Sequence, residues 1–292
     1  MHADEIHVDD ELVRSLVDAQ LPQWADLPLR RVSSTGTDNA IYRLGDELGV
    51  RVPRIHWAVA QIAKEHEWLP RLAPHLPAAV PEPVATGAPG LDYPYPWLVY
   101  RWLDGEDALA GAVADWGSLA REVAAFVGAL RRVDPAGGPP ARGRGGPLAP
   151  HDADARRAIR ALDGEIDVDR ALEVWEAALA ADPWTGPPVW VHGDLLPGNI
   201  VVDGGRLVGV IDWSAAGVGD PACEAMLAWS LPPDACAVYR AALAFDDPTW
   251  ARARGRALLQ AAMFIPYYAE TIPDGVAAAR RRLDAVLADD GM

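Results

Sequence analysis

The sequence predicts an α+β chain, with a strand-rich part up to about residue 104 and a mostly helical part after it. The first hundred residues contain several short strand patterns and one helical pattern, whereas amphipathic helical spacing dominates the later residues. A length of 292 residues is enough for two lobes around two cores, or for one large core. We expect two lobes, over 1–103 and 104–292, with a hinge near residues 100–104.

The elements of the first part follow from the spacing of its apolar residues. Trp57, Ile62, Leu69 and Leu72 recur at helical intervals, so they define one face of a helix over 57–73. The other elements expected here are a short amphipathic helix over 6–19, two strands around a polar turn within 29–44, and strands over 48–52 and 97–102.

The second part is predicted as helices joined by turns. Asp115 is a candidate cap for a helix over 115–132. Residues 134–150 are rich in glycine and proline and predict a loop, and an Asp-Gly-Gly turn at 203–205 predicts a hairpin. The remaining expectations are helices around 151–163 and 169–181, a strand over 189–192, and mostly helix over 221–290.

Composition excludes several classes of partner. The net charge of −16 disfavours nucleic acid and anionic membranes, since both bind clustered lysine and arginine. The sequence has no apolar run of 18 or more residues and no secretory signal pattern at its start. Its two cysteines, Cys223 and Cys236, suit neither a disulfide framework nor a zinc site. We expect a cytoplasmic protein, monomeric or homodimeric, with a small molecule as its partner.

The most informative segment runs from Val191 to Pro221, VHGDLLPGNIVVDGGRLVGVIDWSAAGVGDP. Asp194 and Asn199 lie in a loop, because a Pro-Gly pair between them interrupts any helix. A strand pair then returns Asp212 to the same end, so three oxygen-bearing side chains are expected to converge. Phosphoryl transfer needs one carboxylate to orient the attacking hydroxyl, and an amide and a second carboxylate to hold Mg²⁺.

The spacing His-x-Asp-Leu-x-x-x-Asn matches the catalytic loop of protein kinases. The string HGDLLPGNI followed by IDWSAAGVGDP resembles the signature of the aminoglycoside/macrolide phosphotransferase family. The resemblance extends over the chain in element order, and this segment is its specific part. It implies a bilobal protein-kinase-like fold, with a small β-rich N-terminal lobe that binds nucleotide and a larger, mostly helical C-terminal lobe.

The resemblance also implies residue roles in the catalytic loop. Asp194 resembles the catalytic aspartate, and Asn199 and Asp212 resemble the Mg²⁺ ligands, with ATP or GTP as the phosphoryl donor. For His192 a part in catalysis and a supporting role both stay open, with support favoured. A lone His-Gly-Asp turn is usually only a capped loop, but the full set at these spacings favours catalysis.

Two acidic residues after the loop have expected supporting roles. Asp220 belongs to the family signature Val-Gly-Asp-Pro and is expected to hydrogen-bond the backbone of the catalytic loop. Glu224 follows one helical turn later and either does the same or faces solvent.

The front lobe is expected to supply a cation for the phosphates. Protein kinases place a lysine on the third strand, paired with a helix glutamate. The strand here reads Leu-Gly-Val-Arg-Val-Pro-Arg, so Arg51 takes that position, and the Arg-Val-Pro-Arg string resembles the macrolide branch. A guanidinium binds phosphate oxygens bidentately. Glu65 is the expected partner and Glu67 its competitor, and the alternative for Arg51 is a solvated strand arginine.

Two further regions complete the expected binding sites. A polar turn resembles the loop that covers the nucleotide, although a plain hairpin turn explains it equally well. The hinge would bind the purine edge through its backbone, and aromatic and acidic residues of the helical half are weak candidates for the substrate pocket. The turn residues are Ser33, Ser34 and Thr35, the hinge residues are Tyr100, Arg101, Trp102 and Leu103, and the substrate candidates are Tyr267, Tyr268 and Glu270.

The function expected is a Mg²⁺-dependent O-phosphotransferase acting on an antibiotic of the aminoglycoside or macrolide type and conferring resistance. The alternative is a metabolite kinase for an amino sugar, a choline-like alcohol or a methylthioribose-like sugar. A catalytically inactive binding module is a remote alternative, because Asp194, Asn199 and Asp212 are intact. Protein kinase activity is disfavoured, since the residues between Asp212 and Pro221 are too few for an activation loop. The negative net charge favours an aminoglycoside and Arg51 a macrolide, so the substrate stays open.

Overall fold

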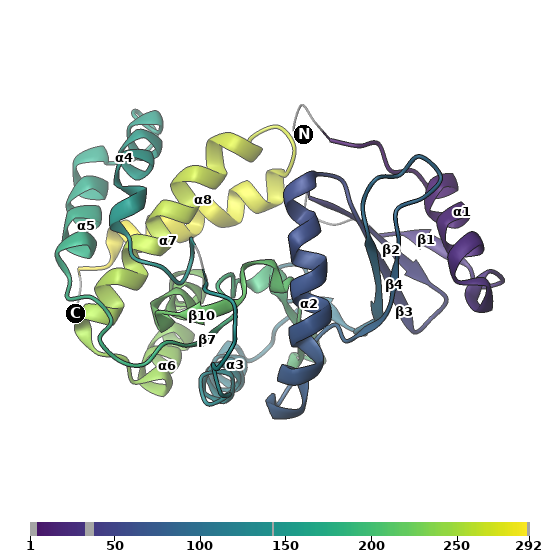
Figure 1. Cartoon of the computed structure of the whole chain (residues 1–292). Coiled ribbons are helices and arrows are strands. Elements are labelled where there is room, and N and C mark those ends of the chain that lie inside the picture. The colour runs from purple at the N-terminus through teal and green to yellow at the C-terminus, as the bar shows by residue number, and fades with distance from the viewer. Residues whose placement is uncertain (1–4, 33–37, 142, 291–292) are drawn as a thin grey trace. The chain divides into compact units, whose positions relative to one another are not determined.

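The structure is a computed structural model that describes residues 5–32, 38–141 and 143–290 (Figure 1). The chain divides into two compact units. The first unit comprises Met1–Pro74, Ala79–Asp104 and Val208–Ser214, and the second comprises His75–Ala78, Gly105–Leu207 and Ala215–Met292. Asp212 therefore belongs to the first unit, although it lies far beyond residue 104 in the sequence. A single domain boundary near residue 104 would place Asp212 in the second unit, whereas it belongs to the first.

An antiparallel sheet forms the centre of the first unit, with its strands in the order β1-β2-β3-β5-β4. The strands are β1 (Leu29–Arg31), β2 (Asn39–Leu44), β3 (Leu48–Pro53), β4 (Pro83–Gly87) and β5 (Trp97–Arg101). Every residue of the central strand β3 is buried. The sequence analysis did not find β4, because its five residues begin with proline, end with glycine and show no run of β-branched or aromatic side chains.

Two helices pack on this sheet (Figure 1). Helix α1 (Asp10–Gln20) contacts β1 and β4, and the Asp9 carboxylate caps its first turn by accepting from the Leu12 N–H. Helix α2 (Val59–Leu72) contacts β4 and β5. Its buried face holds Glu65 among leucine and isoleucine side chains. A buried carboxylate on an apolar face requires a partner, and β3 supplies one.

The second unit is built around α7 (Asp247–Tyr268), against which three other helices pack. Small side chains allow the close approach: a Cβ at Gly255 would lie 2.4 Å from the Ala178 Cβ. The packing partners are α4 (Asp152–Ala161), α5 (Val168–Ala180) and α8 (Pro273–Ala288), and a further pair is formed by α3 (Trp116–Leu130) and α6 (Pro233–Leu243) (Figure 1). Across the described ranges, no helix combines the length and the apolarity needed to cross a bilayer.

Short strands and 3₁₀ segments lie between the helices of the chain. Strand β7 (Val189–Val191) pairs with β10 (Gly217–Gly219), and β6 (Glu106–Asp107) pairs with β8 (Ile200–Asp203), which is joined to β9 (Arg206–Val210). The 3₁₀ segments are Pro22–Trp24, His56–Ala58, Ala73–His75, Ala149–His151, Pro197–Asn199, Trp213–Ala215 and Pro221–Ser230. The segment between β7 and β8 is the predicted catalytic loop.

Candidate active site

The catalytic loop turns sharply at Gly193, directly before Asp194. Gly193 has a φ of +80°, and a Cβ there would lie 2.9 Å from the Ala215 carbonyl oxygen. Only glycine takes a left-handed conformation in so tight a space without strain. The turn therefore fixes where the Asp194 side chain leaves the backbone.

The loop is closed by hydrogen bonds around Asp194. The Asn199 amide Nδ2 donates to the Asp194 carbonyl at 2.8 Å, so its Oδ1 remains the atom for a cation. His192 is fully buried, and its Nδ1 accepts from the Asp194 N–H at 3.3 Å. These contacts bring the three predicted loop residues together, with His192 behind the backbone of Asp194.

The backbone of this loop is held by Glu224, and not by Asp220 as the sequence analysis expected. The Glu224 Oε1 accepts from the Gly193 N–H at 2.8 Å. The Asp220 carboxylate instead caps the Pro221–Ser230 segment through the Ala222 N–H and binds the Arg252 guanidinium at 2.8 Å. Asp220 is the N-cap residue of Pro221–Ser230, and its short side chain hydrogen-bonds the start of that segment. The longer side chain of Glu224 reaches the catalytic loop.

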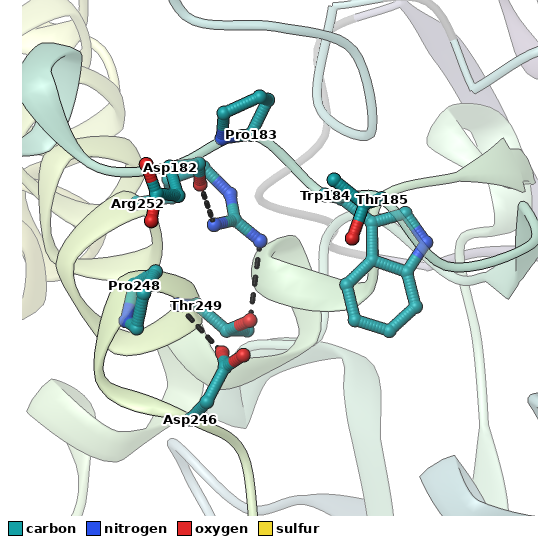
Figure 2. Close-up of a pocket in the computed structure, with 8 residues that line it drawn as sticks. All are labelled: Asp182, Pro183, Trp184, Thr185, Asp246, Pro248, Thr249 and Arg252. Carbon is teal, nitrogen blue, oxygen red and sulfur yellow. Dashed lines mark hydrogen bonds between the residues drawn. The ribbon is translucent and has the colours of Figure 1, made fainter.

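Arg252 also borders a pocket of about 280 Å³ in the second unit, shown in Figure 2. Its guanidinium donates to the Asp220 carboxylate, the Asp182 carbonyl and the Thr249 hydroxyl. Its hydrogen-bonding capacity is thus largely used by the protein itself. None of the predicted site residues lines this pocket, so we regard it as part of the scaffold.

The Asp194 carboxylate forms an ion pair with Arg144. Arg144 comes from the glycine- and proline-rich stretch predicted as a loop, which the sequence analysis did not connect with the site. Here that stretch is anchored, because the Ala141 N–H donates to the Val218 carbonyl at 2.9 Å and the Asp220 N–H to the Gly145 carbonyl at 2.9 Å. Arg144 is therefore held beside Asp194 by β10 and its continuation.

In the first unit, Arg51 makes the contact predicted for it. Its Nη1 donates to both oxygens of Glu65 at 2.7 Å, and its Nη2 donates to the Gln61 Oε1 at 2.9 Å. Arg51 is 8% exposed and Glu65 5%. Burial by itself lowers the pKa of Arg51, but Glu65 and Asp212 outweigh it and raise that pKa. Glu67 lies on the outside and pairs with Arg71.

Asp212 has a left-handed backbone, with a φ of +59°. Aspartate tolerates this conformation better than most residues, and such strain is commonly found at functional sites. Its Oδ1 accepts from the Ser214 N–H at 3.3 Å, and the Lys64 ammonium donates to the Ser214 carbonyl at 2.5 Å. Burial lowers the pKa of Lys64, and Glu65 opposes this shift. The sequence analysis gave Lys64 no role.

The predicted hinge uses part of its backbone within the first unit. The Arg101 N–H donates to the Glu82 carbonyl and the Trp102 N–H to the Glu47 carbonyl, both at 2.8 Å. Among the described residues, the Leu103 N–H has no backbone hydrogen-bond partner. Tyr100 lies beside Arg51, and burial raises the pKa of its hydroxyl. Ser33, Ser34 and Thr35 lie outside the described residues.

The weak substrate candidates lie at the end of α7. Tyr267 is 52% exposed, and its ring meets that of Tyr268 edge to face at 4.6 Å. The Tyr268 ring also lies 4.4 Å from that of Phe264. Glu270 is exposed just beyond the helix. The structure thus places an aromatic cluster at this end of the helix.

A model of the APH family, the phosphotransferase enzyme family, matches residues 29–256. The chain belongs to this family. Among solved structures, a GDP complex of a point variant of aminoglycoside 2'-phosphotransferase-IIIa superimposes with a TM-score of 0.72 and 19% identity, covering 96% of this chain and 98% of that chain. Macrolide 2'-phosphotransferase MphH from Brachybacterium faecium gives a TM-score of 0.61 and 27% identity, covering 95% and 97%.

A further relative is the uncharacterized protein YcbJ of Bacillus subtilis (strain 168), which is 36% identical over 74 residues. The match spans 22% of this chain and 24% of that protein's length. The family resemblance and the α+β, protein-kinase-like fold class expected from the sequence are confirmed by the family and structural matches. As a family member, the chain is a kinase-type phosphotransferase.

The buried Glu224 predicts a pH-dependent stability. Burial raises its pKa from the ordinary 4.5 to about 7, against the hydrogen bond from Gly193. Because the folded chain then binds the proton more tightly than the unfolded chain, the free energy of unfolding should fall as the pH rises between these values, by up to about 3 kcal/mol. Glu224→Gln keeps an acceptor for the Gly193 N–H and should remove this loss.

The measurement is urea unfolding of both proteins at about pH 5 and about pH 8, with the exposed Glu47→Gln as control. We expect Glu224→Gln to gain stability relative to the wild type as the pH rises, and Glu47→Gln to follow the wild type. Parallel pH profiles for wild type and Glu224→Gln would contradict the assignment.

Proposed function

We propose that the chain is an O-phosphotransferase that moves the γ-phosphoryl group of ATP or GTP onto a hydroxyl of a small molecule. The observation that carries this proposal is the closed loop in which Asn199 binds the Asp194 carbonyl. The hydroxyl oxygen forms a bond to the γ-phosphorus as the bond to the β,γ-bridging oxygen breaks. The hydroxyl proton passes to the Asp194 carboxylate, and the nucleoside diphosphate leaves with the electron pair.

The residues assigned to Mg²⁺ are Asn199 and Asp212. Each offers an oxygen donor of the class that Mg²⁺ prefers, and the Asn199 amide is turned so that Oδ1 is its remaining acceptor. When bound, the ion would neutralise charge on the phosphates. Binding of the donor phosphates is assigned to Arg51, whose guanidinium is oriented by Glu65 and Gln61. The Leu103 N–H is assigned to the base edge.

The acceptor class has two candidates. An antibiotic of the aminoglycoside or macrolide type, with resistance as the outcome, is supported by the names of the structural neighbours, which are aminoglycoside and macrolide phosphotransferases. A metabolite is the second candidate, and the ion pair between Asp194 and Arg144 favours it over a polycation. The Arg144 guanidinium would repel a cationic acceptor near the position of its attacking hydroxyl. Following nucleotide consumption with ATP and GTP against a panel of hydroxylated antibiotics and metabolites separates the two.

Asp194→Asn should lower kcat by about a thousandfold and leave nucleotide affinity nearly unchanged, because the amide cannot accept the hydroxyl proton. The exposed Asp203→Asn serves as the matched control and should behave like the wild type. Steady-state kinetics and nucleotide titration measure the two effects. Retention of more than about a tenth of the wild-type kcat would remove Asp194 from this role.

Asp212→Asn should make nucleotide binding insensitive to Mg²⁺ and reduce turnover at least about a hundredfold. Asparagine is chosen because it tolerates the left-handed backbone of Asp212, so the fold is preserved. Calorimetric titration of nucleotide with Mg²⁺ and with EDTA gives the measurement, and the exposed Asp26→Asn is the control. Full activity of the wild type in excess EDTA would overturn the metal assignment.

Arg51→Ala should raise the KM for nucleotide about tenfold or more. Arg51→Lys should recover part of the loss, since lysine keeps the positive charge but cannot make a bidentate contact with the phosphates. Arg51→Ala leaves Glu65 buried without its cation, at a cost of about 3–5 kcal/mol, so kinetics are compared only where thermal unfolding shows folded protein. The exposed Arg30→Ala is the control. A folded Arg51→Ala with the wild-type KM would refute the phosphate role.

A further inference from the structure

The Asp194 carboxylate lies in the field of two guanidinium groups. Arg144 forms a direct ion pair with it, with the two side chains 34% and 19% exposed. Arg282 on α8 also interacts electrostatically with Asp194 and, unfavourably, with Arg144. One carboxylate thus faces two cations in the second unit. The surroundings of the attacking hydroxyl are therefore positive, although the chain as a whole is strongly negative.

Arg282 is only 5% exposed, yet its contacts with the described residues leave its charge incompletely balanced. Its Nη2 donates to the Gln260 side chain, which carries no charge. Within residues 5–32, 38–141 and 143–290, no carboxylate lies within ion-pair distance of Arg282. Burial lowers the pKa of Arg282 to about 10, and Asp194 opposes this shift. A buried guanidinium without a paired anion is costly, so Arg282 is a candidate partner for an anion that binds there.

Arg144 is positioned by the scaffold and not only by its contact with Asp194. Arg256 is 4% exposed and donates to the Gly143 and Gly146 carbonyls, on either side of Arg144. The Gly145 N–H donates to the Ala141 carbonyl at 3.0 Å. The backbone that carries Arg144 is thus fixed independently of its side chain, so an incoming anion can replace Asp194 as its partner without rearranging the segment.

The helices around these arginines indicate which reactant brings the anion. Gln260, the partner of Arg282, lies on α7 with Phe264 and Tyr268 following at four-residue intervals, so the three share one side of the helix. Phe264 and Tyr268 belong to the aromatic cluster described above. The nucleotide-binding residues proposed above, Arg51 and Leu103, lie in the other unit. The aromatic side chains on this side of α7 favour the acceptor over the donor as the source of the anion.

We propose that Arg144 and Arg282 form an oxyanion-binding subsite beside Asp194, and that the acceptor carries a carboxylate or phosphate group close to the hydroxyl that is phosphorylated. This inference rests on the proposed phosphotransferase function. The acceptor's anion pairs with Arg144 and frees the Asp194 carboxylate to accept the hydroxyl proton. Polycationic acceptors are rejected by the same two charges.

The first test is a series of acceptors that share one scaffold and differ in charge: glucose, glucosamine, glucuronate and glucose 6-phosphate. We expect the wild type to have a kcat/KM at least about tenfold higher for the anionic members than for glucose, with glucosamine the poorest. Arg282→Gln and Arg144→Gln should remove the anionic preference, so that the ratio of kcat/KM for glucuronate to that for glucose falls to about one. The exposed neighbour Arg281→Gln should retain the preference.

Two outcomes of this series overturn the proposal. One is a preference for glucosamine. The other is an equal loss for glucose and the anionic members in Arg144→Gln and Arg282→Gln, which would assign the arginines to the transferred phosphoryl group. If no hexose is phosphorylated, the binding experiment below decides alone.

The second test measures binding of inorganic phosphate by calorimetry while a nonhydrolysable ATP analogue with Mg²⁺ occupies the donor site. We expect phosphate to bind the wild type and Arg281→Gln, and to bind Arg144→Gln and Arg282→Gln at least about tenfold more weakly. Loss of phosphate binding on addition of the analogue, or no effect of either variant, overturns the proposal. Arginine-dependent phosphate binding in a chain that transfers no phosphoryl group to any acceptor would refute the proposed function and leave the subsite standing.

Discussion

A single buried hydrogen bond, from the Gly193 N–H to the Glu224 carboxylate, holds the turn that carries Asp194. Gly193 adopts a backbone that other residues avoid, and Asp194 follows it directly. Glu224 is fixed in turn by the helical segment that Asp220 begins, and the Tyr239 hydroxyl donates to its carbonyl at 3.0 Å. The second Glu224 oxygen is buried without a partner among the described groups. Holding the turn therefore costs free energy, because one oxygen of the Glu224 carboxylate is buried without a hydrogen bond.

Charge is distributed in opposite ways at the two proposed parts of the site. In the first unit, the Arg51 guanidinium is balanced by Glu65 and lies in addition in the field of Asp212. In the second unit, Arg144 and Arg282 exceed the single charge of Asp194. The charge beside Asp194 and the net charge of the chain therefore differ in sign. The net charge of −16 is for this reason a poor predictor of the charge of the proposed acceptor.

The fold class and the family could be predicted from the sequence, because the catalytic-loop motif is long and the spacing of its polar residues is restrictive. The contact between Arg51 and Glu65 could also be expected, since both lie at kinase-like positions on a strand and the helix after it. Strand β4 was missed because it has almost no local strand signal. The functional roles of the predicted residues remain predictions until the kinetic experiments are done.

Other parts of the site depend on packing between distant segments and have no local pattern. Arg144 and Arg282 reach the surroundings of Asp194 from a glycine-rich segment and from the last helix, and neither approach is encoded by spacing. The contact of the loop with Glu224, and not with Asp220, has the same origin. Both are acidic and close in sequence, and only the position of the cap decides which of them reaches the loop.

Lys64 gives the chain an unusual chemical handle. It is the single lysine, so an amine-directed reagent has one side-chain target. Burial lowers its pKa, which increases the fraction of neutral, nucleophilic amine at neutral pH. Its ammonium group donates to the Ser214 carbonyl, two residues after Asp212. A fluorophore or mass label at this position would therefore report on the segment that carries Asp212, without the need to remove other lysines first.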